Sequence, residues 1–135
     1  MGLSSEVVNA KSTVLVTDDD EAVRGSVADI LALSGYEVLQ AADGGEALRV
    51  LDQQSVDVLL LDMAMPKLDG LAVLEALGQP PPKVILLSAL ARYSPEDIDR
   101  KGLSEKVTRT LHKPCPPVEL LAAVNDAMDE LHNED

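Results

Sequence analysis

Short apolar runs alternate along this chain with segments whose apolar residues recur at helical spacing. Runs rich in β-branched and aliphatic residues predict strands, whereas the longer periodic segments predict amphipathic helices. The strands are expected at residues 13–17, 37–41, 56–61, 83–87 and 107–112. The third run, VDVLLL, is almost wholly apolar, which is typical of a strand that is buried on both faces of a parallel sheet.

Helical patterns fill the intervals between these strands. The first follows the acidic DDDE sequence and is expected to end at Gly35, because glycine is the usual residue just beyond a helix. The other helices are expected at residues 45–53, 71–77, 94–106 and 117–131, of which 94–106 is the least regular and predicts only a short helix. Four residues are expected to form the apolar face of the last helix, namely Val118, Leu121, Val124 and Met128.

This alternation predicts an α/β fold, a doubly wound five-stranded parallel sheet with helices on both faces, because parallel strands need crossover connections. The length of 135 residues fits one domain. We expect a flexible tail at residues 1–11, the domain at 12–131 and a second tail at 132–135.

Charge and composition narrow the function. Eleven Lys and Arg against 24 Asp and Glu give a net charge of −13, which disfavours binding to nucleic acid and to anionic membranes. No apolar stretch is long enough to span a bilayer and the first residues do not resemble a signal peptide, so a cytoplasmic location is expected. A single cysteine, Cys115, rules out a disulfide within the chain. The scarcity of aromatic residues argues against a stacking platform for bases.

Polar residues follow the predicted strands where such sheets bind ligands, at the carboxyl ends. Asp18, Asp19 and Asp20 follow the first strand, and Asp62, Ser88 and Lys113 follow the third, fourth and fifth strands. Carboxylates packed within about 4 to 6 Å repel one another, each pair by about 4 kcal/mol at an effective dielectric constant near 20. A hard cation with oxygen ligands would offset that repulsion. Mg²⁺ is preferred, with Mn²⁺ as an alternative, because Mg²⁺ leaves room for phosphate oxygens.

Four segments, VLVTDDDEAVR, VLLLDMAMPKLDG, VILLSA and LHKP, occur in the order and spacing of the response regulator receiver domain. The resemblance covers residues 13–131 and implies the flavodoxin-like receiver fold with strand order 2-1-3-4-5. It implies that Asp62 is the phosphoacceptor and that Ser88 and Lys113 contact the phosphoryl group. By the same resemblance, the metal ligands are Asp18, Asp19, Asp62 and the main-chain carbonyl of Ala64.

The implied function is a phosphorylation-dependent switch of a two-component phosphorelay. A histidine kinase or histidine phosphotransfer protein would supply the phosphoryl group with Mg²⁺, and self-phosphorylation with slow autodephosphorylation would be the only catalysis. Because no output domain is recognised, we expect a chemotaxis-regulator-like single-domain protein that acts through an unknown downstream protein. We expect it to be a monomer or a weak dimer.

Other interpretations remain open from the sequence. The three acids at 18–20 could serve merely as caps of the first helix. Turn formation could explain Asp62 and Ser88, and Lys113 could be a solvated surface lysine. A pseudo-receiver would keep the fold as a binding module without being phosphorylated. A metal-dependent phosphatase would use Asp18 and Asp20 as nucleophile and acid, although its motif requires threonine where this chain has Ala22.

Three departures from the receiver pattern concern signalling. Thr110 stands where many receivers have an aromatic residue, which puts aromatic coupling in doubt, and Cys115 replaces a bulky apolar residue. His112 and Cys115 are expected to be structural. The irregular segment 94–106 suggests a helix that becomes ordered on phosphorylation.

Overall fold

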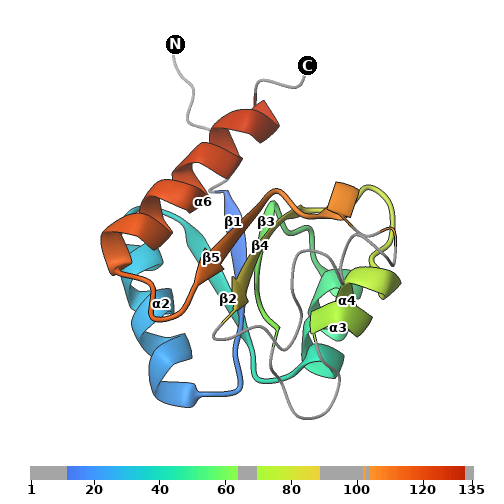
Figure 1. Ribbon diagram of the computed structural model, residues 1–135, viewed down its shortest axis with the longest axis horizontal. Helices are drawn as coiled ribbons and strands as arrows, with labels where there is room; N and C mark the ends of the chain where they lie inside the picture. The colour runs from blue at the N-terminus through green and yellow to red at the C-terminus, as the bar shows by residue number, and fades with distance from the viewer. Residues whose placement is uncertain (1–11, 64–69, 89–101, 103, 133–135) are drawn as a thin grey trace.

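A single parallel sheet of five strands forms the centre of the molecule (Figure 1). The computed structural model describes residues 12–63, 70–88, 102 and 104–132, without the side chains of Leu71, Ser88 and Ser104. The strands are β1 Thr13–Thr17, β2 Glu37–Ala41, β3 Val58–Asp62, β4 Lys83–Ser88 and β5 Arg109–His112. Their order is β2-β1-β3-β4-β5, and all neighbours are parallel. The expected fold class and strand order are therefore confirmed.

Helices cover both faces of this sheet (Figure 1). One face carries α2 Glu21–Leu33 and α6 Pro117–His132, and the other carries α3 Gly44–Gln53 and α4 Gly70–Ala76. A short 3₁₀ helix, η1 Ser104–Lys106, precedes β5. Among the described residues, no helix combines the length and apolar character that a bilayer span requires.

The core has two layers, one on each face of the sheet. Within β3, Leu59 and Leu61 pack toward α3 and α4, whereas Val58 and Leu60 pack toward α2 and α6. All five residues of β3 are buried, as its apolar sequence predicts. Complete burial of one leucine or valine side chain stabilises a protein by about 1.5–3 kcal/mol. The four buried aliphatic residues of β3 therefore contribute strongly to the stability of both core layers.

The ends of several elements differ from the sequence prediction. β3 begins at Val58 rather than Val56 and ends at Asp62, so the last residue of the strand is itself a candidate site residue. β5 begins at Arg109, two residues later than expected, although Val107 still packs against the core. The predicted fourth helix, residues 94–106, lies mostly outside the described residues. Its last three residues form η1.

The apolar face expected for the last helix was wrong at one position. Val118 is 81% exposed, while the buried residues of α6 are Leu120, Ala123, Val124, Ala127 and Met128. Each residue turns an α-helix by about 100°, so Val118 lies almost opposite Leu120. The buried face includes two small alanines, which a search for large apolar residues does not detect.

Candidate metal centre

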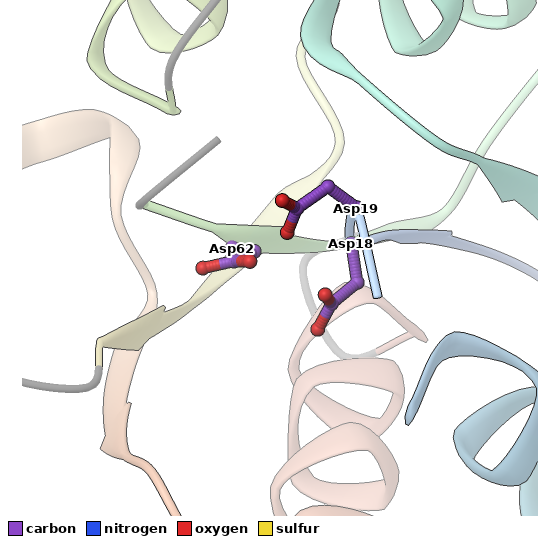
Figure 2. Close-up of side chains that lie close together, drawn as sticks. All are labelled: Asp18, Asp19 and Asp62. Carbon is purple, nitrogen blue, oxygen red and sulfur yellow. The ribbon is translucent and has the colours of Figure 1, made fainter. Parts of the chain in front are cut away.

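The carboxyl ends of β1 and β3 bring three aspartates together. Asp18 and Asp19 directly follow β1, and Asp62 is the last residue of the neighbouring strand β3. One carboxylate oxygen from each lies within 4.8 Å of those from the other two, and Figure 2 shows the three groups gathered at these strand ends. Asp18 and Asp62 are buried, whereas Asp19 is exposed. The predicted convergence of these acids is confirmed.

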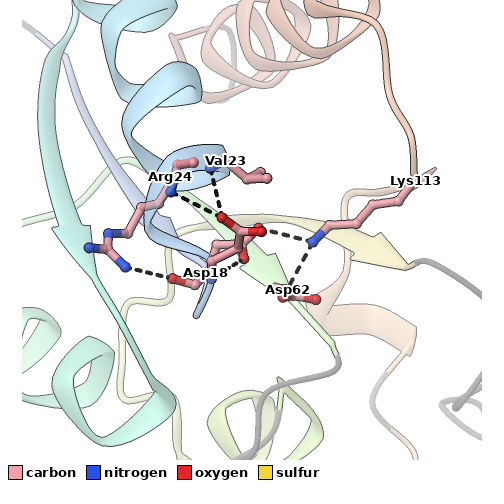
Figure 3. A network of polar contacts seen from close by, with 7 residues as sticks. Asp18, Val23, Arg24, Asp62 and Lys113 are labelled. Atoms are coloured by element: carbon pink, nitrogen blue, oxygen red, sulfur yellow. Dashed lines mark hydrogen bonds and ion pairs between the residues drawn. The ribbon is translucent and has the colours of Figure 1, made fainter.

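Lys113 closes this cluster from the side of β5. Its Nζ lies 2.9 Å from Oδ2 of Asp18 and 3.3 Å from Oδ2 of Asp62, as the dashed lines of Figure 3 show. The Asp18 and Asp62 side chains are only 2% and 4% exposed, so a lone carboxylate at either place would be costly. One ammonium group therefore partly neutralises two buried acids, which excludes the reading of Lys113 as a purely solvated lysine.

The pKa of Lys113 reflects these two opposing influences. Burial alone lowers the pKa of the ammonium group, because it disfavours the charged form. The hydrogen bond to Asp18 and the negative charges of Asp62 and Asp18 act in the opposite direction and prevail, so the pKa is raised above the usual 10.5. Lys113 is consequently a cation throughout the physiological pH range.

Hydrogen bonds hold Asp18 at both its backbone and its side chain. Its amide donates to the carbonyl of Ala41 in β2 at 3.1 Å, and its carbonyl accepts from Nη1 of Arg24 at 2.9 Å. Its Oδ1 accepts from the amide of Asp20 at 2.9 Å, and its Oδ2 accepts from Lys113. Asp18 is thus fixed to three other parts of the fold, namely β2, α2 and the segment after β5.

Asp20 has a different role from its two acidic neighbours. It is the N-cap of α2, where its Oδ1 accepts from the amides of Ala22 and Val23 at 3.0 and 3.1 Å. The cap interpretation therefore holds for Asp20 alone and leaves Asp18 and Asp19 for the site, as the sequence suggested.

Gly70 allows α4 to begin close to the end of β3. A Cβ atom at this position would lie 2.5 Å from Sδ of Met63, 3.0 Å from its Cα and 3.1 Å from the carbonyl oxygen of Asp62. Any side chain larger than hydrogen would therefore press on the backbone that carries Asp62. Packing of α4 and placement of the candidate acceptor are coupled through this glycine.

The acidic cluster fits a hard divalent cation. Its donors are carboxylate oxygens, which Mg²⁺ prefers, and one of the three acids is open to solvent. Lys113 pairs with Asp18 and Asp62 and carries one positive charge, whereas the cluster holds three carboxylates. A divalent ion would add positive charge among carboxylates that repel one another at this distance.

The other predicted site residues are described only in part. Ser88 ends β4 opposite His112 of β5, which agrees with its expected strand end, but its side chain lies outside the described residues. Ala64 also lies outside them. Thr110 is exposed on β5, where an aromatic residue was noted as missing. Cys115 packs against the core, as expected for a structural residue, and His112 is exposed.

Sequence reasoning missed two residues that support the site. Arg24 was not considered, and Gly70 was interpreted only as a break before a helix. No spacing rule points to Arg24, because its partners are the main-chain carbonyl of Asp18, six residues earlier, and the side chain of Gln40 in another strand. The contact of Gly70 could not be foreseen, because it depends on how α4 approaches β3 in space.

Comparison with known proteins identifies the family. The family model described as "Response regulator receiver domain" matches residues 14–125. The transcriptional regulatory protein PrrA of Mycobacterium tuberculosis is 41% identical over 111 residues, which cover 82% of this chain and 47% of that protein. The response regulator MprA of Mycobacterium avium is 38% identical over 122 residues, covering 90% of this chain and 53% of that protein.

Solved structures agree with this result. A CheY-like receiver domain protein from Methanospirillum hungatei superimposes with a TM-score of 0.84 at 30% identity, covering 93% of this chain and all of that one. The receiver domain of the Francisella response regulator 1452 gives 0.77 at 33% identity, covering 89% and 98%. The chain therefore belongs to the response regulator receiver family of two-component signalling. It spans about half the length of the curated relatives that it matches.

Proposed function

We propose that Asp62 accepts a phosphoryl group and that Mg²⁺, held by Asp18, Asp19 and Asp62, assists the transfer. The observation that carries this proposal is the convergence of three carboxylates within 4.8 Å beside the Lys113 ammonium group. A carboxylate of Asp62 would attack the phosphorus atom, and the bond from phosphorus to the donor would break as the acyl phosphate forms. The Ala64 carbonyl would complete the ligand set and Mn²⁺ could replace Mg²⁺, as the family resemblance implies.

Each residue of the candidate site would have a distinct role in this reaction. When bound, the ion would neutralise charge on the phosphoryl oxygens during transfer. Asp18 and Asp19 would position that ion, and their attachment to β1 means that little reorganisation is needed. Lys113 is already within 3.3 Å of Asp62 and would pair with a phosphoryl oxygen, while the Ser88 hydroxyl would donate to another.

Phosphorylation would change the balance of charge around Lys113. The phosphoryl group adds about −1.5 to −2 charges and three strong hydrogen-bond acceptors at this point. Lys113 would then exchange part of its contact with Asp18 for the new group. Because Lys113 follows β5, the change would be felt first in the segment between β5 and α6, and this displacement is the proposed switch.

Two alternatives receive less support from the geometry. A phosphatase that uses Asp18 and Asp20 would need Asp20 to face the site, yet Asp20 caps α2. A pseudo-receiver would have no need for a complete acidic set around the partly buried Lys113. We therefore favour a phosphorylated receiver, whose phosphoryl donor would be a histidine kinase or a histidine phosphotransfer protein.

The experiment that tests the acceptor is phosphorylation by a small donor. The parent protein is incubated with acetyl phosphate and Mg²⁺, and its intact mass is measured before and after mild alkaline treatment. One labile adduct is expected in the parent and in Asp52→Asn, because Asp52 is an exposed residue of α3. No adduct is expected in Asp62→Asn. Equal labelling of Asp62→Asn and Asp52→Asn would refute the assignment.

The remaining parts of the proposal concern the setting of the switch. We propose that residues 12–131 form the signalling unit, that it works in the cytoplasm and that its output is an interaction with another protein. The net charge of −13 supports a protein partner rather than nucleic acid. A pull-down with the phosphorylated and unphosphorylated forms tests the output, since a partner retained equally by both would contradict a phosphorylation-dependent signal.

A further inference from the structure

Arg24 lies behind the acidic cluster and contacts the backbone between two of its acids. Its Nη1 donates to the carbonyl oxygen of Asp18 at 2.9 Å, as Figure 3 shows. Its Nε donates to Oε1 of Gln40 at 3.1 Å. Arg24 belongs to α2 and Gln40 to β2. Among the described residues Arg24 forms no ion pair with a carboxylate, so the Asp18 carbonyl and Gln40 are the partners of its guanidinium group.

The carbonyl that Arg24 holds belongs to the peptide unit that joins Asp18 to Asp19. A peptide unit is planar, so fixing its oxygen also fixes the direction in which the chain enters Asp19. The opposite side of Asp18 is fixed by its own amide, which donates to Ala41 at 3.1 Å. Arg24 therefore supplies the second of two backbone anchors that decide where both acids point.

We propose that Arg24 is a positioning residue for the metal site, which it supports through the Asp18–Asp19 peptide without touching the ion. The inference rests on the proposed function, because it assumes that Asp18 and Asp19 bind a divalent cation. Arginine suits this position because its rigid fork can serve the carbonyl and Gln40 together. Lysine would offer one compact donor and could not hold both acceptors in the same way.

The sign of the effect separates positioning from bulk electrostatics. Removing a positive charge makes the protein more negative, which on electrostatic grounds alone should tighten the binding of Mg²⁺. If Arg24 positions the acids, its loss should instead weaken binding by about tenfold, the lower end of what the loss of a supporting hydrogen bond costs at metal sites. The two explanations therefore predict opposite changes in the dissociation constant.

The test compares Arg24→Met with Arg49→Met by calorimetric titration of Mg²⁺ into unphosphorylated protein. Arg49 is an exposed residue of α3, so both substitutions remove one arginine charge and keep a long apolar stem. We expect the dissociation constant to rise about tenfold in Arg24→Met. It should stay within about twofold of the parent in Arg49→Met, and Arg24→Lys should fall between the parent and Arg24→Met.

A second measurement needs no metal. The amide of Asp20 donates to Oδ1 of Asp18 at 2.9 Å, so its hydrogen exchange reports on the order of this segment. Exchange of that amide should be faster in metal-free Arg24→Met than in the parent, with thermal unfolding used to confirm that both are folded. Unchanged exchange would overturn the inference whether or not the protein binds metal.

The outcomes also distinguish this inference from the proposed function. A parent that takes no Mg²⁺ would overturn both. A parent that binds Mg²⁺, with an Arg24→Met variant that binds equally well or more tightly, would overturn the inference alone and leave the assignment of Asp62 untouched.

Discussion

A methyl group added at Gly70 would collide with the strand end that carries Asp62. The new Cβ would meet Sδ of Met63 at 2.5 Å and two backbone atoms at 3.0 and 3.1 Å. The sulfur could move only within a core where Met63 is 2% exposed, and the backbone must yield by a few tenths of an ångström. Overpacking of this kind costs about 1–3 kcal/mol, so Gly70→Ala should lower the free energy of unfolding by that amount.

The same substitution in α2 provides a matched control with the opposite sign. A Cβ at Gly25 would meet nothing within 4 Å, and alanine is favoured over glycine inside a helix by about 0.5–1 kcal/mol. Gly25→Ala should therefore raise the midpoint of urea unfolding while Gly70→Ala lowers it. With about 3–5 °C of melting temperature per kcal/mol for a domain of this size, the two variants should also separate clearly by thermal unfolding.

The coupling to Asp62 adds a functional readout to this pair. Gly70→Ala should also slow phosphorylation by acetyl phosphate, because the carbonyl of Asp62 is among the atoms displaced, whereas Gly25→Ala should leave that rate unchanged. If Gly70→Ala proved as stable as Gly25→Ala, the argument from close packing would be wrong. A stable variant with a reduced rate would likewise refute the proposed link between packing and the site.

Three further predictions concern other buried or partly buried groups. Thr17→Val should raise the free energy of unfolding by about 1 kcal/mol in urea titrations, because the fully buried Thr17 hydroxyl has no hydrogen-bond partner among the described residues. A decrease of about 1 kcal/mol in the free energy of unfolding would contradict this prediction. Lys113→Met should melt at a lower temperature than the parent by a constant margin up to about pH 10. The difference in melting temperature should shrink above about pH 10, because the pKa of Lys113 is raised in the folded protein. The stabilisation from Lys113 is complete below its pKa in the unfolded chain, 10.5, and is lost as the pH rises through its higher pKa in the folded protein. Cys115 should react with iodoacetamide at pH 7.5 more slowly than a free cysteine, since burial raises the pKa of its thiol; labelling at the rate of free cysteine would contradict that.

The sequence predicted the sheet and the convergence of the three aspartates well, because both depend on local pattern. The apolar VDVLLL run identifies β3, and acidic residues at the carboxyl ends of β1 and β3 must meet when the two strands are parallel neighbours. Lys113 was expected at the same edge of the sheet because it follows the fifth strand, and it lies 3.3 Å from Asp62. These conclusions need the order of the strands but no detail of side-chain packing.

Features that depend on the approach of distant elements were not predictable in this way. The face of α6 was misjudged at Val118, because small alanines rather than large residues form part of its buried side. The contacts of Arg24 with Asp18 and Gln40 join α2, β1 and β2, and their spacing in the sequence gives no direct sign of this bridge. The roles of Asp62, Lys113, Ser88 and Ala64 in phosphoryl transfer stay predictions.

The two halves of the candidate site stand on strands of very different exposure. Asp62 ends β3, which lies between β1 and β4 with every residue buried, whereas Lys113 follows β5 at the margin of the sheet, where three of four residues are exposed. Edge strands open by local fluctuations at a smaller free-energy cost than central strands. We therefore expect Lys113 to detach more readily than the acids separate. If Asp62 is phosphorylated as proposed, a signal that passes through Lys113 would rise and decay without unfolding the strand that holds the phosphoryl group.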